Sequence, residues 1–334
     1  MTMLSRLLRI VAQGVTALLI LLIACFALTR LAYRNPAAML APLNATQESI
    51  DAITRALRLD DPWYLQLWYY LYRGPAVQGA PMGLFNWPPG LGYSFRRQAP
   101  VTDLIIERIP ATLSLVAGAA VIWLALSILC GVWAARHQGR WQDRLSGALA
   151  CITMSVPVLL SGILLSYVFF YQLTEAGWPI FPSSGYVPLR ENPLEWARHL
   201  ALPWFALALA EVGMFQRVVR GAVLDVATQD YIRTARAKGL RERRIWFDHA
   251  LSAALNPVMT LGALEIGTLL GGAIVTETIF GIDGLGRLAL SAALTGDFPV
   301  VIGTTVIAGL AIILSTGIGD LIIGWRERTG QATE

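Results

Sequence analysis

The chain has 334 residues, of which 55% are hydrophobic and 14% are charged, and its mean hydropathy is +0.56. A soluble domain would contain about a quarter charged residues, so the composition excludes an ordinary soluble protein and predicts an integral membrane protein. The net charge of +4 does not indicate nucleic-acid binding, because the arginines cluster beside apolar segments, where they orient membrane helices.

The first apolar run extends from Ile10 to Leu28 and follows Arg6 and Arg9. It is too long for the hydrophobic core of a typical secretory signal, and no small-x-small cleavage site follows it. We therefore expect a retained first membrane helix in residues 1–31. The two arginines predict that the N-terminus is cytoplasmic.

Residues 32–104 form a long polar region that we expect outside the membrane, followed by a core transmembrane region in residues 105–334. Within the polar region, the stretch WYLQLWYYLYRG begins at Trp63 and is dense in tryptophan and tyrosine. Such residues are typical of the membrane interface, which is the favoured interpretation. A docking platform for an external partner is the alternative.

The later apolar runs predict five further spans, at about 111–135, 145–173, 199–219, 253–280 and 299–323. A bend is expected in the third span at Pro157, because proline lacks the backbone donor that a helix needs. Basic loops follow the second and fourth spans, and a basic segment follows the sixth. This charge distribution predicts that both termini are cytoplasmic.

Three acidic residues, Glu211, Glu265 and Asp320, fall inside these spans. Carboxylates are costly in hydrocarbon, so each is expected to face a cavity or pathway, to contact another helix or to pair with a cation. The structural alternatives are a pair between Glu211 and Arg217 and a pair between Asp320 and a nearby arginine. A proton-coupled carrier would also use such acids, although the chain contains no detectable two-fold repeat.

Other reactive residues form no recognisable site. Cys25, Cys130 and Cys151 all lie in apolar runs and are expected to be buried small hydrophobes, not a disulfide or metal framework. The three histidines lie near the ends of predicted spans, and no metalloprotease or serine-hydrolase motif is present. A membrane enzyme is therefore not expected.

The segment that organises the sequence is Asp230–Leu251, DYIRTARAKGLRERRIWFDHAL, the longest polar run between two strongly apolar segments. Its arginines and its single lysine, Lys238, predict a cytoplasmic loop. The pattern also predicts two short helices around Gly239, which can adopt a positive φ and reverse the chain. The positive charge of this segment by itself would also be explained by an ordinary basic cytoplasmic loop.

The residues around Gly239 form a pattern that is more specific than the charge of the loop. TARAKGL followed by HALSAALNPV resembles the cytoplasmic coupling loop of ABC-importer permeases of the dipeptide/oligopeptide/nickel family. LRLDDPWYLQLWYYL, LGYSF and APVTDLIIERIPATLSL are similar to the segment that joins the first two spans of that family, and TETIFGIDGLGRLALSAALTGDFPVV is similar to its external re-entrant segment. Residues 74–89 are additional to the family pattern, so a large external insertion is expected between the first two helices.

The resemblance implies an all-α integral membrane protein with the six transmembrane helices of the type I ABC importer permease fold. It implies a coupling loop at 225–250 whose contact with an ATPase involves Tyr231, Thr234, Ala235, Arg236, Ala237, Lys238, Gly239 and Leu240. It also implies an external gate or turn formed by Glu277, Phe280, Gly284 and Gly286.

The implied function is ATP-driven import of di- or oligopeptides, with this chain forming half of the pathway in the bacterial inner membrane. Nickel, a metallophore or another small solute is the alternative cargo, and a proton-coupled carrier is the alternative class. The spans contain no Met/His/Cys cluster, which favours peptides. The chain has no phosphate-binding loop, so no cofactor is expected in it, and ATP and Mg²⁺ would be bound by partners. Those partners are a second permease, two ATPase subunits and an extracytoplasmic solute-binding protein.

Overall fold

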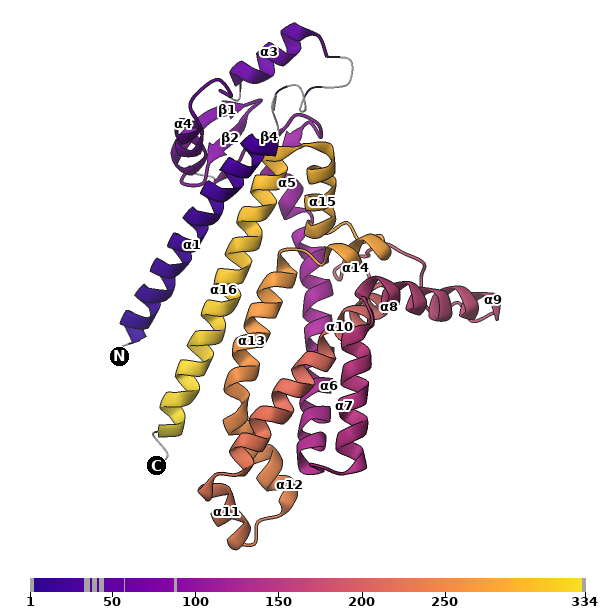
Figure 1. The fold of residues 1–334 in the computed structure, drawn as a ribbon. Coiled ribbons are helices and arrows are strands. Elements are labelled where there is room, and N and C mark those ends of the chain that lie inside the picture. The colour runs from indigo at the N-terminus through magenta and orange to yellow at the C-terminus, as the bar shows by residue number, and fades with distance from the viewer. Residues whose placement is uncertain are drawn as a thin grey trace. The chain divides into compact units, whose positions relative to one another are not determined.

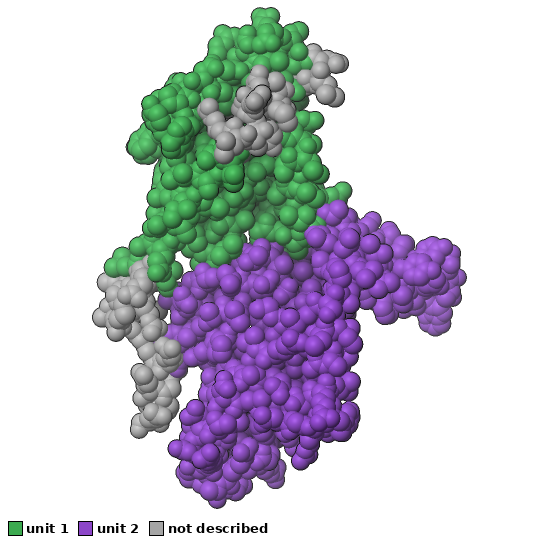
Figure 2. Space-filling view, viewed as in Figure 1, with its two compact units in different colours: residues 1–112, 270–274, 283–314 green, residues 113–269, 275–282, 315–334 purple. Residues whose placement is uncertain are grey.

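The computed structural model describes residues 3–32, 37, 41, 45–56, 58–86 and 89–331. The described chain divides into two compact units, which are coloured separately in Figure 2. Unit 1 contains residues 1–112, 270–274 and 283–314, and unit 2 contains residues 113–269, 275–282 and 315–334. The division expected from sequence at residues 32 and 104 stays a prediction.

Unit 1 combines long helices with a small β-structure. Its helical elements are α1 (Met3–Ala32), α3 (Gln47–Ala56), α4 (Trp63–Trp68), the π-helical η1 (Tyr69–Arg73), α5 (Val101–Ile106), the start of α6 (Ile109–Arg136), α15 (Leu285–Thr295) and the first part of α16 (Phe298–Gln331). Its strands are β1 (Gly74–Val77), β2 (Ala80–Gly83), β3 (Gly90–Leu91), β4 (Tyr93–Ser94) and β5 (Ala99–Pro100).

The segment expected as an insertion contains a β-hairpin. Strands β1 and β2 pair antiparallel, with Val77 opposite Ala80, and β3 pairs with the other edge of β2. Gln78 and Gly79 connect the hairpin with φ angles of 48° and 81°, which is the sign pattern of a two-residue type I′ turn. Trp87 and Pro88 of the expected insertion lie outside the described residues.

The core of unit 1 lies between α1, α5, α15 and α16. In Figure 1, α1 runs alongside α16, and two glycines explain how closely the helices approach. A Cβ atom on Gly14 would lie 2.6 Å from Ile313, and one on Gly309 would lie 2.7 Å from Leu21. The apolar cluster between these helices contains Leu22, Phe26, Tyr70, Leu91, Val101, Ile105, Leu288, Val300, Ile302 and Val306.

A buried polar contact joins β4 to the turn between α15 and α16. Ser94 Oγ donates to Asp297 Oδ2 at 2.6 Å, and both side chains are at most 1% exposed. Arg97 N donates to Ser94 Oγ, and the Arg97 guanidinium donates to Ser291. Burial raises the pKa of Asp297, and the opposing influence of Ser94, Arg97 and Arg96 is smaller.

Unit 2 contains the remaining helices. These are most of α6, α7 (Trp141–Ser155), α8 (Val158–Leu165), η2 (Ser166–Gln172), α9 (Leu173–Glu175), α10 (Pro193–Ala227), α11 (Asp230–Ala237), α12 (Glu242–Arg244), η3 (Ile245–Leu251), α13 (Ser252–Leu270), most of α14 (Ile274–Ile279) and the end of α16. Helix α10 begins after Asn192, whose side chain accepts hydrogen bonds from the backbone N–H groups of Leu194 and Glu195.

Helix α10 packs against both α7 and α8. A Cβ atom on Gly213 would lie 2.5 Å from the backbone oxygen of Ala150, so the glycine permits close contact between α7 and α10. Further along this contact, Arg220 donates to both carboxylate oxygens of Asp143, at 2.6 and 2.8 Å. These hydrogen bonds hold the pKa of Asp143 below its usual range.

Within the described residues, six helical segments are long and apolar enough to cross a membrane. They are Ile10–Leu28, Val101–Arg136, Val158–Glu175, Pro193–Ala227, Glu242–Leu270 and Phe298–Arg326. The number agrees with the sequence prediction, but several boundaries differ, and two of them mark breaks in a helix. The bend at Pro157 separates α7 from the third span, which begins at Val158 and not near Leu145. The fifth span ends at Leu270 and not at Phe280, because the chain leaves the helix at Gly271.

The contact between Ser94 and Asp297 predicts a specific pH dependence. The pKa of Asp297 is raised above its ordinary value, so the folded state holds the proton more tightly than the unfolded state does. The contribution of this group to stability is therefore complete at low pH and is lost as the pH rises through the folded-state pKa. We expect Asp297→Asn to remove that loss, which thermal denaturation of wild type and variant across acid and neutral pH would measure.

Asp60→Asn, at an exposed carboxylate of the same unit, is the matched control and should leave the pH profile unchanged. Ser94→Ala should lower the melting temperature by removing the hydroxyl donor from a buried carboxyl group, at a cost of about 1–3 kcal/mol. A pH profile of Asp297→Asn identical to that of wild type would contradict this account of Asp297.

Candidate functional site

The residues expected to form the coupling loop lie together at one end of unit 2. Figure 1 shows α11 and α12 beyond the ends of α10 and α13, so the loop connects two candidate spans directly. Only Thr228 and Gln229 separate α10 from α11. On the other side, η3 continues without interruption into α13. A force applied to α11 therefore reaches two membrane helices through short connections.

Local hydrogen bonds explain why α11 ends where the sequence predicts a reversal. Gly239 N donates to Arg236 O at 2.9 Å, and Leu240 N donates to Ala235 O at 3.3 Å. This pair is the Schellman pattern, which requires a left-handed residue after the helix. Gly239 supplies it with a φ of +75°, and a Cβ atom there would meet nothing within 4 Å. The glycine is therefore required for its backbone conformation and not for space.

The inner face of α11 is apolar and contacts η3. Ile232 and Ala235 are buried on α11, and Ile245, Trp246 and Ala250 are buried on η3. A helix of eight residues is not stable alone in water, so this burial is what keeps α11 folded.

One carboxylate fastens the two helices together at the edge of this apolar contact. Glu242 Oε1 accepts from Arg236 Nε at 3.0 Å, and Glu242 Oε2 accepts from Trp246 Nε1 at 2.8 Å. The Arg236 guanidinium also lies 5.7 Å from the centre of the Trp246 ring, within range of a cation–π interaction. We call Arg236, Glu242 and Trp246 the clamp.

The outer face of α11 is exposed and positively charged. Tyr231, Thr234, Ala237 and Lys238 are all exposed, and Tyr231 is 49% exposed. Leu240 is half-buried where the chain turns back. The face thus combines an aromatic side chain, a hydroxyl and a cation on a short helix and its C-cap, a composition suited to docking into a partner with acidic edges.

The structure brings two of the three intramembrane acids together. Glu211 on α10 and Glu265 on α13 are half-buried, and they lie near enough for their like charges to repel each other. The suggested pair of Glu211 with Arg217 is not formed, because Arg217 donates to Cys151 Sγ instead. Asp320 on α16 is exposed and makes no ion pair with the side chains that the structure describes.

The four residues expected in an external gate or turn fall into both units. In unit 2, Glu277 is fully buried, and Phe280 O accepts from Gly185 N at 2.9 Å. In unit 1, Gly284 precedes α15 as its N-cap residue, and a Cβ atom on Gly286 would lie 2.9 Å from the backbone nitrogen of Ile274. Their role in a gate stays a prediction.

Sequence reasoning missed the partners within the clamp. Arg236 was selected for its place beside Gly239, but Glu242 and Trp246 were not selected. The signal available was the spacing of Glu242 and Trp246, which are four residues apart and meet when that segment is helical. Asp143 and Asp297 were also missed, because their partners lie 77 and 203 residues away in the sequence.

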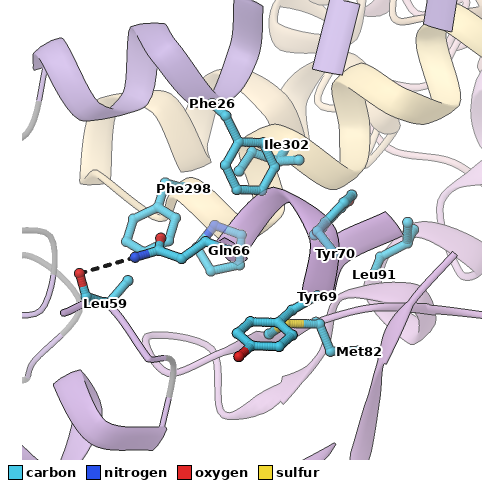
Figure 3. A pocket seen from close by; sticks show the side chains of 11 residues that line it. Phe26, Leu59, Gln66, Tyr69, Tyr70, Met82, Leu91, Phe298 and Ile302 are labelled. Carbon is cyan, nitrogen blue, oxygen red and sulfur yellow. Dashed lines mark hydrogen bonds between the residues drawn. The ribbon is translucent and has the colours of Figure 1, made fainter. Parts of the chain in front are cut away.

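Unit 1 contains a small apolar cavity of about 50 Å³, shown in Figure 3. Phe26, Phe298 and Ile302 line one side, and Met82 lines another. At its edge, Gln66 Nε2 donates to Leu59 O at 3.0 Å. Sites for small organic molecules usually measure about 300–1,000 Å³, so this cavity is too small to hold a peptide.

Comparisons with known proteins identify relatives along nearly the whole chain. Residues 127–329 match a family described as the binding-protein-dependent transport system inner membrane component, and residues 3–116 match the N-terminal part of a binding-protein-dependent transport system membrane component. A putative peptide transport system permease of Brucella abortus is 38% identical over 96% of both chains. The oligopeptide transport system permease AppB of Bacillus subtilis is 33% identical over 93% of this chain and 94% of its own.

Two further comparisons add detail. The glutathione transport system permease GsiC of Escherichia coli is 34% identical over 86% of both chains. A solved structure of the methionine ABC transporter MetNI, in an inward-facing conformation, aligns with a TM-score of 0.53 over 67% of this chain and 97% of that chain. Its sequence identity of 19% makes this a likeness of fold, and the fold is that of a type I ABC importer permease.

The clamp can be tested by removing its tryptophan, which should weaken the contact between α11 and η3. We expect Trp246→Ala to release α11 from η3, because truncating a buried tryptophan typically costs about 3–5 kcal/mol. Hydrogen exchange of the α11 amides should become markedly faster, with the amides of α7 unaffected. Phe247→Ala, at the next and more exposed aromatic residue, is the matched control and should leave α11 protected. Equal exchange in both variants would show that Trp246 does not hold α11.

Proposed function

The chain belongs to the family of binding-protein-dependent transport system inner membrane components, and on that premise we propose that it is the permease subunit of an ATP-driven importer of di- and oligopeptides. The observation that carries the proposal is α11, a short exposed helix that is clamped to η3 and joined directly to α10 and α13. In this function the chain forms half of the translocation pathway and catalyses no reaction itself.

The mechanism is mechanical. Two ATPase subunits bind ATP and Mg²⁺ and close together, and each moves the α11 helix that docks into it. The clamp prevents α11 from rotating on its own, so its displacement passes to α10 and α13. Those helices carry Glu211 and Glu265 towards one side of the pathway or the other. A second related permease completes the pathway, and an extracytoplasmic solute-binding protein delivers the cargo.

The charge of the loop supports this docking. Lys238 is exposed directly after α11, and Arg233 is exposed on it beside Asp230, so a cleft with acidic edges on the ATPase would complement these two cations. The same cations resist translocation, which supports a cytoplasmic position for the loop and for both termini. Residues 32–104 then lie on the extracytoplasmic side, where the binding protein arrives.

The cargo class rests on the names of the relatives, which mention peptides, oligopeptides and glutathione. Uptake of labelled di- and oligopeptides, compared with uptake of ⁶³Ni²⁺ in the same cells, separates peptide transport from the alternative of nickel or a metallophore. Peptide uptake that disappears when the gene is deleted, with nickel uptake unchanged, is the expected result.

Gly239 offers the sharpest mutational test of coupling. Proline cannot adopt a φ of +75° and lacks the N–H that bonds to Arg236 O, so Gly239→Pro should displace α11 from its position. We expect the ATP hydrolysis stimulated by peptide and binding protein to fall by roughly tenfold, within the usual range of coupling energies. The measurement is ATPase activity of the reconstituted complex.

Gly177 provides a matched control in another loop. It follows α9 with a φ of +83°, has no atom within 4 Å of a Cβ position, and donates its N–H to Thr174 O at 3.0 Å. Gly177→Pro should therefore disturb a helix end to the same degree while coupling persists. Uptake that continues without ATP and follows a proton gradient would instead favour the proton-coupled carrier, with Glu211 and Glu265 as its site.

A further inference from the structure

Unit 2 contains a second hollow that the proposed transport mechanism does not use. It is an open groove of about 450 Å³ between α7 and α10. Its lining residues are Asp143, Arg144, Gly147, Gln216, Arg217 and Arg220. The three arginines outnumber the one aspartate by two, so the groove carries a net positive charge.

The charges inside the groove are not balanced by the protein. Both oxygens of Asp143 are occupied by Arg220, and Oδ2 also accepts from Gly139 N at 2.9 Å, so this aspartate is committed to one arginine. Arg217 donates to the thiol of Cys151 and has no carboxylate partner among the described side chains. Arg144 makes no side-chain hydrogen bond or ion pair within the described part of the chain. Two guanidinium groups therefore lack an anion.

Helix α7 also presents an exposed apolar face. On α7, Leu145, Leu149 and Ile152 are 44%, 54% and 58% exposed, and their spacing places them on one face of the helix. Trp141, at the start of α7, is 66% exposed, as is typical of tryptophan at a membrane interface. Helix α7 packs against α10, a candidate span, so this exposed apolar face lies beside the membrane-crossing part of the unit.

These features match the headgroup of an anionic phospholipid. Basic pockets between helices at the cytoplasmic side of a membrane bind anionic headgroups. We propose that the groove binds the phosphate of an anionic phospholipid between Arg144 and Arg217, near the membrane interface that Trp141 marks. That the lipid belongs to the inner leaflet rests on the cytoplasmic orientation of the proposed function.

The site has a consequence for coupling. Arg217 and Arg220 lie on the part of α10 that leads into α11. A phosphate bridging Arg144 and Arg217 adds a connection between α7 and α10, next to the one that Asp143 and Arg220 already make. The bound lipid thereby stiffens the helix that receives the motion of α11.

The experiment uses the full complex reconstituted in nanodiscs of phosphatidylcholine with and without phosphatidylglycerol. Phosphatidylglycerol retained by the complex after extraction is counted by native mass spectrometry. We expect Arg144→Gln and Arg217→Gln each to reduce the affinity for phosphatidylglycerol by about fivefold. Arg144→Lys with Arg217→Lys should keep most of the binding, because the charge remains.

Arg140→Gln is the matched control. Arg140 is exposed and is the residue immediately before α7, but it does not line the groove, so its removal should leave lipid retention unchanged. A variant that carries both Arg144→Gln and Arg217→Gln should retain the least phosphatidylglycerol. Equal lipid retention in wild type and in this double glutamine variant would overturn the proposal. Displacement of the lipid by inorganic phosphate at millimolar concentration would assign the groove to a free anion instead and would also overturn it.

An acidic partner protein is the remaining candidate for the occupant of the groove, and the same variants test it. If the double glutamine variant loses its ATPase subunits in nanodiscs that contain no phosphatidylglycerol, the arginines serve a protein interface and the lipid assignment is wrong. Retention of lipid is measured without transport or ATP hydrolysis. A negative result here therefore leaves the proposed transport function intact, and failure of transport leaves the lipid site intact.

Discussion

The packing of the exposed helix α11 against η3 depends on one carboxylate. Glu242 accepts hydrogen bonds from Arg236 and from Trp246, and so closes the apolar contact that keeps an eight-residue helix folded. A surface ion pair by itself contributes little to stability. Here the ion pair is combined with a buried tryptophan and a Schellman turn at Gly239, and the combination makes the loop a rigid body between α10 and α13. Transport by this family member, as we propose it, requires that rigidity.

Much of this arrangement could be predicted from the sequence because it is local. The length of each apolar run predicted six spans, and the turn at Gly239 between two short helices is confirmed by its positive φ. The predictions that were wrong concern the ends of spans. The bend at Pro157 is confirmed, but apolar residues on both sides of the proline extend the predicted span back to Leu145, and apolar residues past Gly271 conceal the end of the fifth span. The hairpin at 74–83 was missed because its turn is Gln78-Gly79 and not the stronger Asn-Gly signal.

The remaining contacts could not be predicted because they join distant parts of the chain. Ser94 reaches Asp297, and Asp143 reaches Arg220. A single sequence shows that each of these polar residues lies in or beside an apolar segment and therefore needs a partner, but it does not show which partner. The same limit applies to the groove between α7 and α10, whose arginines come from two separate helices.

The central claim is that α11 docks into an ATPase, and site-specific cross-linking tests it most directly. A photoreactive amino acid replaces Thr234, which is exposed on α11, and in a matched variant it replaces Thr174, which is exposed on α9. The account predicts that light joins the Thr234 variant, in its native membrane, to a protein that binds ATP, and that the Thr174 variant gives no such product. A transport-competent Thr234 variant that captures no ATP-binding protein would contradict the account.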